Sequence, residues 1–126
     1  MILNSRQKGD VGEGVACRFL VKQGYRIVEQ NYLKKWGEID IIASKNGAIN
    51  FIEVKSVMKK KEELGNFRPE ENVHVLKRGR LRRVIQTYLL ERRIGLNAEF
   101  SFHVIVIYMD QKTRRASVSF IENVIL

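Results

Sequence analysis

The chain has 126 residues, of which 44% are hydrophobic and 29% are charged, and its net charge is +9. This composition fits one globular domain over residues 1–126 and excludes a disordered chain or a two-domain enzyme. The positive charge favours a phosphate-bearing partner, with nucleic acid first and an anionic membrane surface second. The single Cys17 excludes an internal disulfide, and no signal peptide or membrane-spanning stretch is found. We therefore expect a cytoplasmic protein with no membrane partner.

Apolar periodicity and turn residues predict two helices and five strands. In chain order they are a helix over about residues 8–23, strands over 25–32, 38–43 and 48–57, a helix from about Pro69 or Val73 to Arg93, and strands over 99–109 and 116–125. Gly24 is expected to end the first helix. This order predicts an α/β fold with a mixed central sheet flanked by helices. The fourth strand is expected to return parallel to a central strand.

A tight hairpin is predicted between the second and third strands. Asn46 and Gly47 separate two apolar runs, and this pair is the strongest short-range signal for a two-residue type I′ turn. Such a loop would pair Lys45 with Ala48 and so set the register of the two strands. A four-residue loop over residues 44–47 is the alternative, and it would shift that register.

Four charged side chains lie on these two strands. With the two-residue loop, Asp40 lies opposite Glu53. Glu38 then lies opposite Lys55, and all four side chains project from one face, because side chains alternate along a strand. With the four-residue loop, Glu38 instead lies opposite Glu53. In either register, acidic groups within apolar strands are costly unless a cation compensates them, which indicates a divalent metal ion beside Lys55.

The residues around these charges resemble those of a known family. Residues 37–43 (GEIDIIA) and 51–56 (FIEVKS) resemble the motif pair of the PD-(D/E)XK nuclease superfamily. Further residues narrow the resemblance to the bacterial YraN family, predicted endonucleases related to archaeal Holliday junction resolvases; they are Gly12, Glu13, Asn31, Tyr32, Lys77 and Leu81. The resemblance covers residues from Gly9 to Tyr108. It implies a restriction-endonuclease-like αβββαβ core, dependence on Mg²⁺ or Mn²⁺ and, because related resolvases are dimers, a homodimer.

The resemblance also implies roles for single residues. Asp40 and Glu53 would be the metal-binding carboxylates, and Lys55 would be the catalytic lysine. Glu13 would match the acidic residue that the first helix supplies in the resolvase-like branch. The backbone carbonyl of Val54 would be a further metal ligand.

Two positions depart from the family pattern. Val57 stands where an Arg is usual, and His103, after Phe102, stands where an Asp is usual. His103 could replace the Asp as a hydrogen-bonding group, or it could be a structural residue of an apolar strand. The missing Asp removes one expected supporting group from the fourth strand.

The chemistry of phosphodiester cleavage suits these residues. Mg²⁺ and Mn²⁺ take oxygen ligands and can bridge carboxylate and phosphate. Two nearby carboxylates should keep the Lys55 ammonium charged, which favours stabilisation of developing charge or orientation of the attacking water. A bound metal ion could lower the Lys55 pKa and permit a general-base role. The sequence leaves both roles open, and it leaves open whether one or two ions bind.

Basic side chains are expected to contact nucleic-acid phosphates without reading sequence. The candidates are Lys59, Lys60, Lys61, Lys77, Arg80, Arg114 and Arg115. Tyr32 and Trp36 could stack on an unpaired base, or they could pack in the core. The favoured function is hydrolysis of phosphodiester bonds in DNA, branched or single-stranded forms included. The alternatives are a nucleic-acid-binding module of the same fold that does not cut, and a structural partner subunit that ignores nucleic acid.

Overall fold

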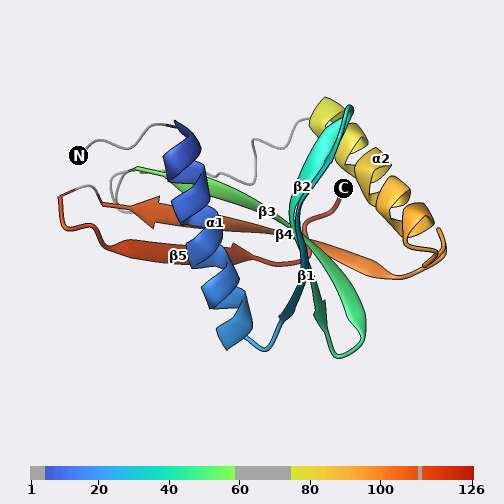
Figure 1. The fold of residues 1–126 in the computed structure, drawn as a ribbon, viewed down its shortest axis with the longest axis horizontal. Coiled ribbons are helices and arrows are strands. Elements are labelled where there is room, and N and C mark those ends of the chain that lie inside the picture. Colours follow the sequence, from blue (N-terminus) through green and yellow to red (C-terminus); the bar gives the residue numbers. More distant parts are fainter. Residues whose placement is uncertain (1–4, 59–74, 111) are drawn as a thin grey trace.

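The computed structural model describes residues 5–58, 75–110 and 112–126. In chain order the elements are α1 (Ser5–Lys22), β1 (Arg26–Lys34), β2 (Gly37–Lys45), β3 (Ala48–Val57), α2 (Val75–Glu91), β4 (Phe100–Met109) and β5 (Ala116–Ile121). They form a five-stranded sheet in the order β1-β2-β3-β4-β5 (Figure 1). β3 and β4 are parallel, and the other neighbouring pairs are antiparallel. The predicted mixed α/β fold and the parallel return of the fourth strand are confirmed, and the arrangement is compatible with a restriction-endonuclease-like core.

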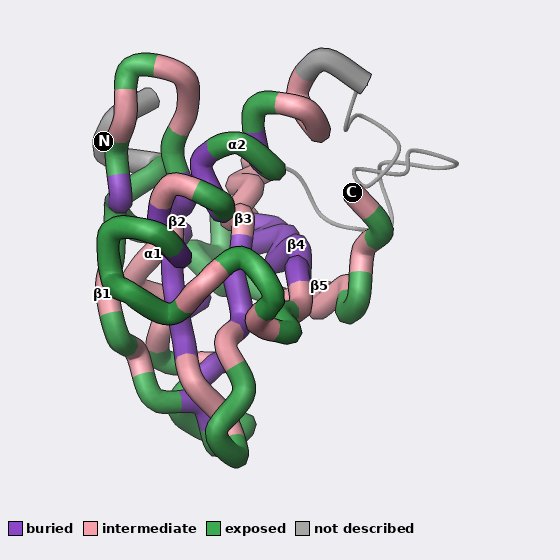
Figure 2. Tube along the Cα trace, turned by 90° about the vertical axis from the view of Figure 1, so that its right-hand side faces the viewer, coloured by how far each residue is buried: buried purple, intermediate pink, exposed green. Residues whose placement is uncertain are grey.

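The two helices cover opposite faces of the sheet. α2 buries Val84 and Ile85 in a core that includes Phe51 of β3. α1 buries Leu20 in a second core that includes Ile52, the next residue along the same strand. Because neighbouring strand residues point to opposite faces, the two cores lie on the two sides of the sheet. β4 is buried along nearly its whole length (Figure 2), as expected for a strand with a helix on each face.

The predicted hairpin turn is confirmed. Asn46 and Gly47 both have positive φ, 51° and 79°, which is the backbone of a type I′ turn. Lys45 pairs with Ala48, so the loop has two residues and the four-residue alternative is wrong. Gly24 follows α1 with a φ of 94°, as predicted for a glycine that ends a helix.

Some element ends differ from the predicted ones. β1 continues to Lys34 because a two-residue turn joins it to Gly37 of β2. β5 ends at Ile121, four residues earlier than predicted, because Asn123 adopts a φ of 56°. The Val124 N–H then donates to the Phe102 carbonyl at 2.8 Å. The start predicted for the second helix, at residue 69 or 73, lies outside the described residues. Its end is Glu91, before Arg93 with a φ of 56°.

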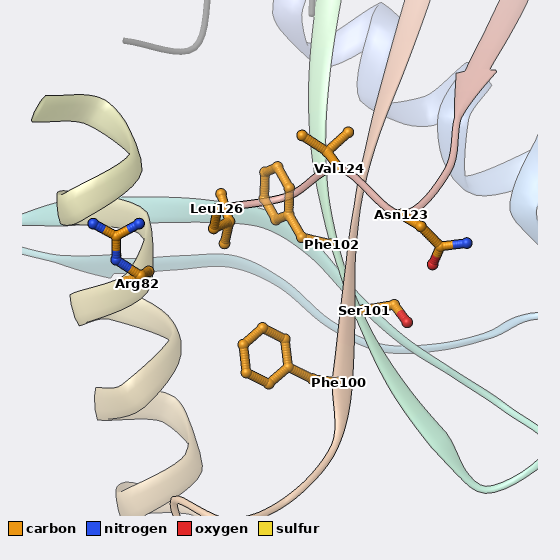
Figure 3. A pocket seen from close by; sticks show the side chains of 7 residues that line it. All are labelled: Arg82, Phe100, Ser101, Phe102, Asn123, Val124 and Leu126. Carbon is orange, nitrogen blue, oxygen red and sulfur yellow. The ribbon is translucent and has the colours of Figure 1, made fainter. Parts of the chain in front are cut away.

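One hollow of about 310 Å³ lies between α2, the start of β4 and the last residues of the chain (Figure 3). Its lining consists of Arg82, Phe100, Ser101, Phe102, Asn123, Val124 and Leu126. Phe100 pairs with Ile49 at the start of β3, whereas Glu53 and Lys55 lie further along that strand. Within the described residues, no helix has both the length and the apolar character needed to cross a membrane.

Candidate metal centre

β2 and β3 separate at the end of the sheet where β2 begins. Their ladder runs from the Lys45–Ala48 pair to the Ile41–Ile52 pair and ends there. Beyond that point β2 stays paired with β1, and β3 stays paired with β4 (Figure 1). We call this divergence, with residues 38–40 on one strand and 53–55 on the other, the fork. The predicted register is therefore confirmed up to the fork, and the predicted cross-strand pairs between residues 38–40 and 53–55 are wrong.

The Asp40 side chain occupies the point of divergence. Its Oδ2 accepts a hydrogen bond from the Val54 N–H at 2.7 Å, so the carboxylate takes the place of the next ladder bond. Burial is the main cause that raises the pKa of Asp40 to about 7. The Val54 N–H opposes this rise, while repulsion from three glutamates at the fork adds to it. A carboxylate in this state is charged only at a cost, which a bound cation would offset.

Three carboxylates meet at the fork. One oxygen from each of Glu13, Glu38 and Asp40 lies within 4.8 Å of the others. The amide nitrogen of Asn31 donates to Glu13 Oε1 at 3.0 Å and to Glu38 Oε1 at 3.1 Å, in the orientation that satisfies all these groups. Burial raises the pKa of Glu13, the Asn31 bond opposes this, and the charges of Glu38 and Asp10 add to it. A neutral amide thus joins two carboxylates without supplying any positive charge.

Close packing of α1 on β3 brings Glu13 to the fork. A Cβ atom on Gly12 would lie 2.0 Å from Ser56 Oγ and 3.3 Å from Ser56 Cβ. Only glycine permits the helix to approach the strand at this distance. The close approach at Gly12 carries the carboxylate of the next residue, Glu13, to the fork.

Glu53 and Lys55 lie on the side of the fork that α2 covers. Glu53 Oε1 forms an ion pair with Lys77 of α2. The other oxygen, Oε2, is buried and has no hydrogen-bond partner among the described residues. Glu53 therefore does not join the group formed by Glu13, Glu38 and Asp40, although its charge contributes to the raised pKa of Asp40.

The pKa of Lys55 is lowered from its usual value, whereas neighbouring carboxylates were expected to favour the charged form. Burial is the main cause that lowers it, and repulsion from Lys77 adds to the effect. The charge of Glu53 acts in the opposite direction but does not prevail. The direction of the shift is opposite to the one that neighbouring carboxylates alone would give, because desolvation and the Lys77 ammonium group outweigh the charge of Glu53.

The basic residues predicted to contact phosphate lie in different parts of the structure. Lys59, Lys60 and Lys61 lie outside the described residues. Lys77 is at the fork, and Arg80 is exposed on the same helix. Arg114 and Arg115 are exposed between β4 and β5. Because Val57 pairs with Tyr108, near the end of β4, that connection lies at the same end of the sheet as the fork.

Three further candidates have structural contacts. Tyr32 is buried and its hydroxyl donates to Glu91 at 2.8 Å, so the core-packing alternative is correct for it. Trp36 is partly buried against the α2 core, with the Arg83 guanidinium 4.3 Å from its ring centre. Nε2 of His103 is 2.7 Å from Asn50 Oδ1, and Nδ1 accepts from the Asn123 N–H at 3.0 Å. These bonds favour the structural interpretation of His103.

Comparison with known proteins places the chain in a family. The family model described as Uncharacterised protein family UPF0102 matches residues 12–107. The chain belongs to this family. UPF0102 is the YraN family that the motifs resemble. This chain is 35% identical to a UPF0102 protein of Caldicellulosiruptor saccharolyticus over 96% of this chain and 98% of that protein. It is 37% identical to one of Moorella thermoacetica over 97% and 98%.

One solved structure is a weaker match to this chain. It is the crystal structure of an XisH family protein from Nostoc punctiforme, with a TM-score of 0.42 and 17% identity, covering 89% of this chain and 99% of that chain. A likeness at this level supports no statement about activity. The UPF0102 match, in contrast, includes every carboxylate and lysine of the fork.

The donor set at the fork of this UPF0102 protein fits a hard divalent cation. The grouped carboxylate oxygens come from α1 and β2, with no Cys or His among the grouped residues. Mg²⁺ and Mn²⁺ prefer such oxygen ligands, whereas zinc sites usually include sulfur or imidazole. Glu53 Oε2, buried and without a hydrogen-bond partner in the part of the chain that the structure describes, is a further oxygen that a cation would satisfy.

Asn31 and Glu38 are the members of this site to which the family resemblance assigned no metal-binding or catalytic role. Glu38 carried a signal, since it lies two residues before Asp40 in the motif. Asn31 adopts a φ of 53° within β1. Asn tolerates that conformation better than most residues, so an Asn within a strand was the available signal for an irregularity there.

Proposed function

We propose that this UPF0102 protein is a Mg²⁺- or Mn²⁺-dependent nuclease that hydrolyses phosphodiester bonds in DNA. The observation that carries the proposal is the convergence at one fork of carboxylates from α1 and β2, with Glu53 of β3 near enough to raise the pKa of Asp40 and a lysine of lowered pKa on the same strand as Glu53. The net charge of +9 supports a polyanionic substrate.

Asp40 and Glu53 would hold the ion, with the backbone carbonyl of Val54 as a further ligand. Asp40 is suited to this role because the Val54 N–H already fixes one of its oxygens. Glu13 and Glu38, held together by Asn31, would bind waters of the ion or a second ion. When bound, the ion would supply a Lewis acid that neutralises charge on the phosphate and lowers the pKa of a coordinated water.

Lys55 would act on the attacking water. Its lowered pKa brings the neutral amine closer to the working pH than it is in an exposed lysine. The neutral amine accepts a proton from water, and the protonated form stabilises the negative charge that develops on the phosphoryl oxygens. Lys55 thereby serves both roles that the sequence left open, one before the proton moves and one after it.

The basic residues at this end of the sheet would hold the DNA backbone. Arg80, Arg114 and Arg115 are exposed there, and contacts of this kind bind phosphate without reading bases. We infer a preference for DNA shape over sequence, with branched or single-stranded DNA as the first substrates to test. A homodimer would place two such forks on one branched molecule.

The proposal is tested by cleavage of a panel of linear, single-stranded, flapped and four-way DNA in Mg²⁺, Mn²⁺ and EDTA. Wild type should cut at least one substrate in a metal-dependent manner. Asp40→Asn and Glu53→Gln should lower the rate at least about 100-fold, as expected when charge stabilisation in a transition state is lost. Glu99→Gln, which changes an exposed carboxylate just before β4, is the matched control. Equal rates in all four proteins would defeat the assignment, and metal-independent DNA binding without cleavage would support the non-cutting alternative.

A further inference from the structure

We propose that Lys77 is an internal counter-ion of the metal centre, which neutralises Glu53 in the metal-free protein and competes with the divalent ion for that carboxylate. This inference rests on the proposed function, because it takes the fork to be the place where the ion binds. It assigns Lys77 a role other than the phosphate contact that the sequence suggests.

The ion pair between Lys77 and Glu53 joins two layers of the fold. Lys77 comes from α2 and Glu53 from the middle of β3. The Glu53 side chain is 15% exposed and that of Lys77 is 40% exposed. A carboxylate this buried needs compensation, whereas a long side chain at the surface retains freedom to move. Lys77 is therefore the partner that can leave, and Glu53 is the partner that stays.

The carboxylates of the fork are compensated unequally. Among the described residues, Glu13 and Glu38 share the neutral amide of Asn31. Glu53 has an ammonium group on one oxygen, while its other oxygen is buried without a hydrogen-bond partner among the described residues. The Lys77 ammonium group thus lies beside Glu53, the carboxylate whose second oxygen could still coordinate a metal ion.

A divalent ion and Lys77 exclude each other for electrostatic reasons. Lys55 and Lys77 already repel one another beside the single Glu53 charge. A doubly charged ion added at this carboxylate would repel both ammonium groups, and Lys77 has the exposed side chain that can turn away. The ion must therefore break the Lys77–Glu53 pair in order to bind, which weakens its affinity.

Calorimetric titration of Mn²⁺ into the metal-free protein, without DNA, tests this competition. Lys77→Met should bind Mn²⁺ roughly five- to twentyfold more tightly than wild type, the range expected when a partly buried competing ion pair is removed. Arg80→Met removes the same charge one turn further along α2 and should change the affinity less than about twofold. In a Glu53→Gln background, Lys77→Met should have no effect on the residual affinity.

An equal effect of Lys77→Met and Arg80→Met would overturn the inference, because it would reduce Lys77 to a general contribution of charge. A Lys77→Met effect that persists with Glu53→Gln would overturn it as well. Failure of wild type to bind Mn²⁺ in a Glu53-dependent manner would instead defeat the proposed function itself, so the two failures are distinguishable.

A second measurement on wild type needs no variant of Lys77. Acetylation of single lysines, followed by mass spectrometry, reports whether an amine is held in an ion pair. Mn²⁺ should increase acetylation of Lys77 several-fold. It should leave acetylation of Lys34, which pairs with Glu91 and not with a carboxylate of the fork, unchanged. Equal acetylation of Lys77 with and without saturating Mn²⁺ would show that the pair survives metal binding and would overturn the inference.

Discussion

Replacement of Asp40 by Asn should stabilise the metal-free protein at neutral and alkaline pH, although it removes a proposed metal ligand. Asn has nearly the same shape, and its side-chain oxygen can still accept the hydrogen bond from the Val54 N–H, which is 2.7 Å long in the structure. The substitution removes the negative charge alone. A gain in stability is unusual for a change at a partly buried polar residue, and it follows here from the burial of the Asp40 charge and the crowding of carboxylates around it.

The magnitude follows from the pKa. Burial, with repulsion from three glutamates, raises the pKa of Asp40 from 3.8 to about 7. Because the folded-state pKa lies above the unfolded value, wild type loses stability as the pH rises from 3.8 to about 7 and recovers it as the pH falls. The whole difference corresponds to about 4 kcal/mol. Relaxation of the neighbouring carboxylates should reduce the gain from Asn to about 1–3 kcal/mol above pH 7.

Urea unfolding in EDTA, followed by the fluorescence of the single Trp36, measures this gain. Asp40→Asn should unfold at a higher urea concentration than wild type at pH 8, and the advantage should shrink at pH 5. Mn²⁺ should stabilise wild type and leave the variant nearly unchanged. Glu99→Gln should match wild type in every condition. No gain at pH 8, or the same gain at both pH values, would refute the reasoning.

Three further predictions concern other parts of the molecule. A Cβ on Gly37 would lie 2.7 Å from Val84 Cγ2, so Gly37→Ala should lower the unfolding free energy, measured with urea, by about 1–3 kcal/mol. This loss should be smaller in a Val84→Ala background, and additive losses from the two substitutions would contradict the contact. Burial lowers the pKa of His103 below its usual 6.5, so the stabilisation that the neutral imidazole provides is lost as the pH falls. The difference in unfolding free energy between wild type and His103→Gln should therefore shrink from pH 7.5 to pH 5, and a constant difference would contradict this. Replacement of Arg114 and Arg115 by Ser should lower the salt slope of DNA binding by about 1–2, measured by fluorescence anisotropy; an unchanged slope would remove both residues from the interface.

The hairpin could be predicted from sequence because local chemistry determines it. Asn46 and Gly47 both tolerate positive φ, and this suffices to fix the turn and the register as far as the Ile41–Ile52 pair. The end of β5 could not be predicted, because the apolar pattern continues past Ile121. What ends the strand is a tertiary contact, the bond from the Asn123 N–H to the His103 ring.

The fork could not be predicted for a similar reason. Residues 37–43 form one apolar run with two acidic side chains, and no turn residue in that run signals where β2 leaves β3. The divergence depends on Asp40 bonding to the Val54 N–H and on α1 bringing Glu13 close. Sequence spacing therefore predicted that Glu38, Asp40 and Glu53 lie near one another, and the family resemblance added Glu13. Packing against the two helices determines that Glu13, Glu38 and Asp40 form one group while Glu53 pairs with Lys77.

The central claim is that the carboxylates of the fork bind one or more divalent ions between β2 and β3. Diffraction from crystals grown with Mn²⁺, with data collected for the anomalous signal of manganese, tests it most directly. The account predicts an anomalous peak at the fork, within coordination distance of carboxylate oxygens of Asp40 and Glu53. A fork without a peak at saturating Mn²⁺, or a peak held by other residues alone, would contradict it.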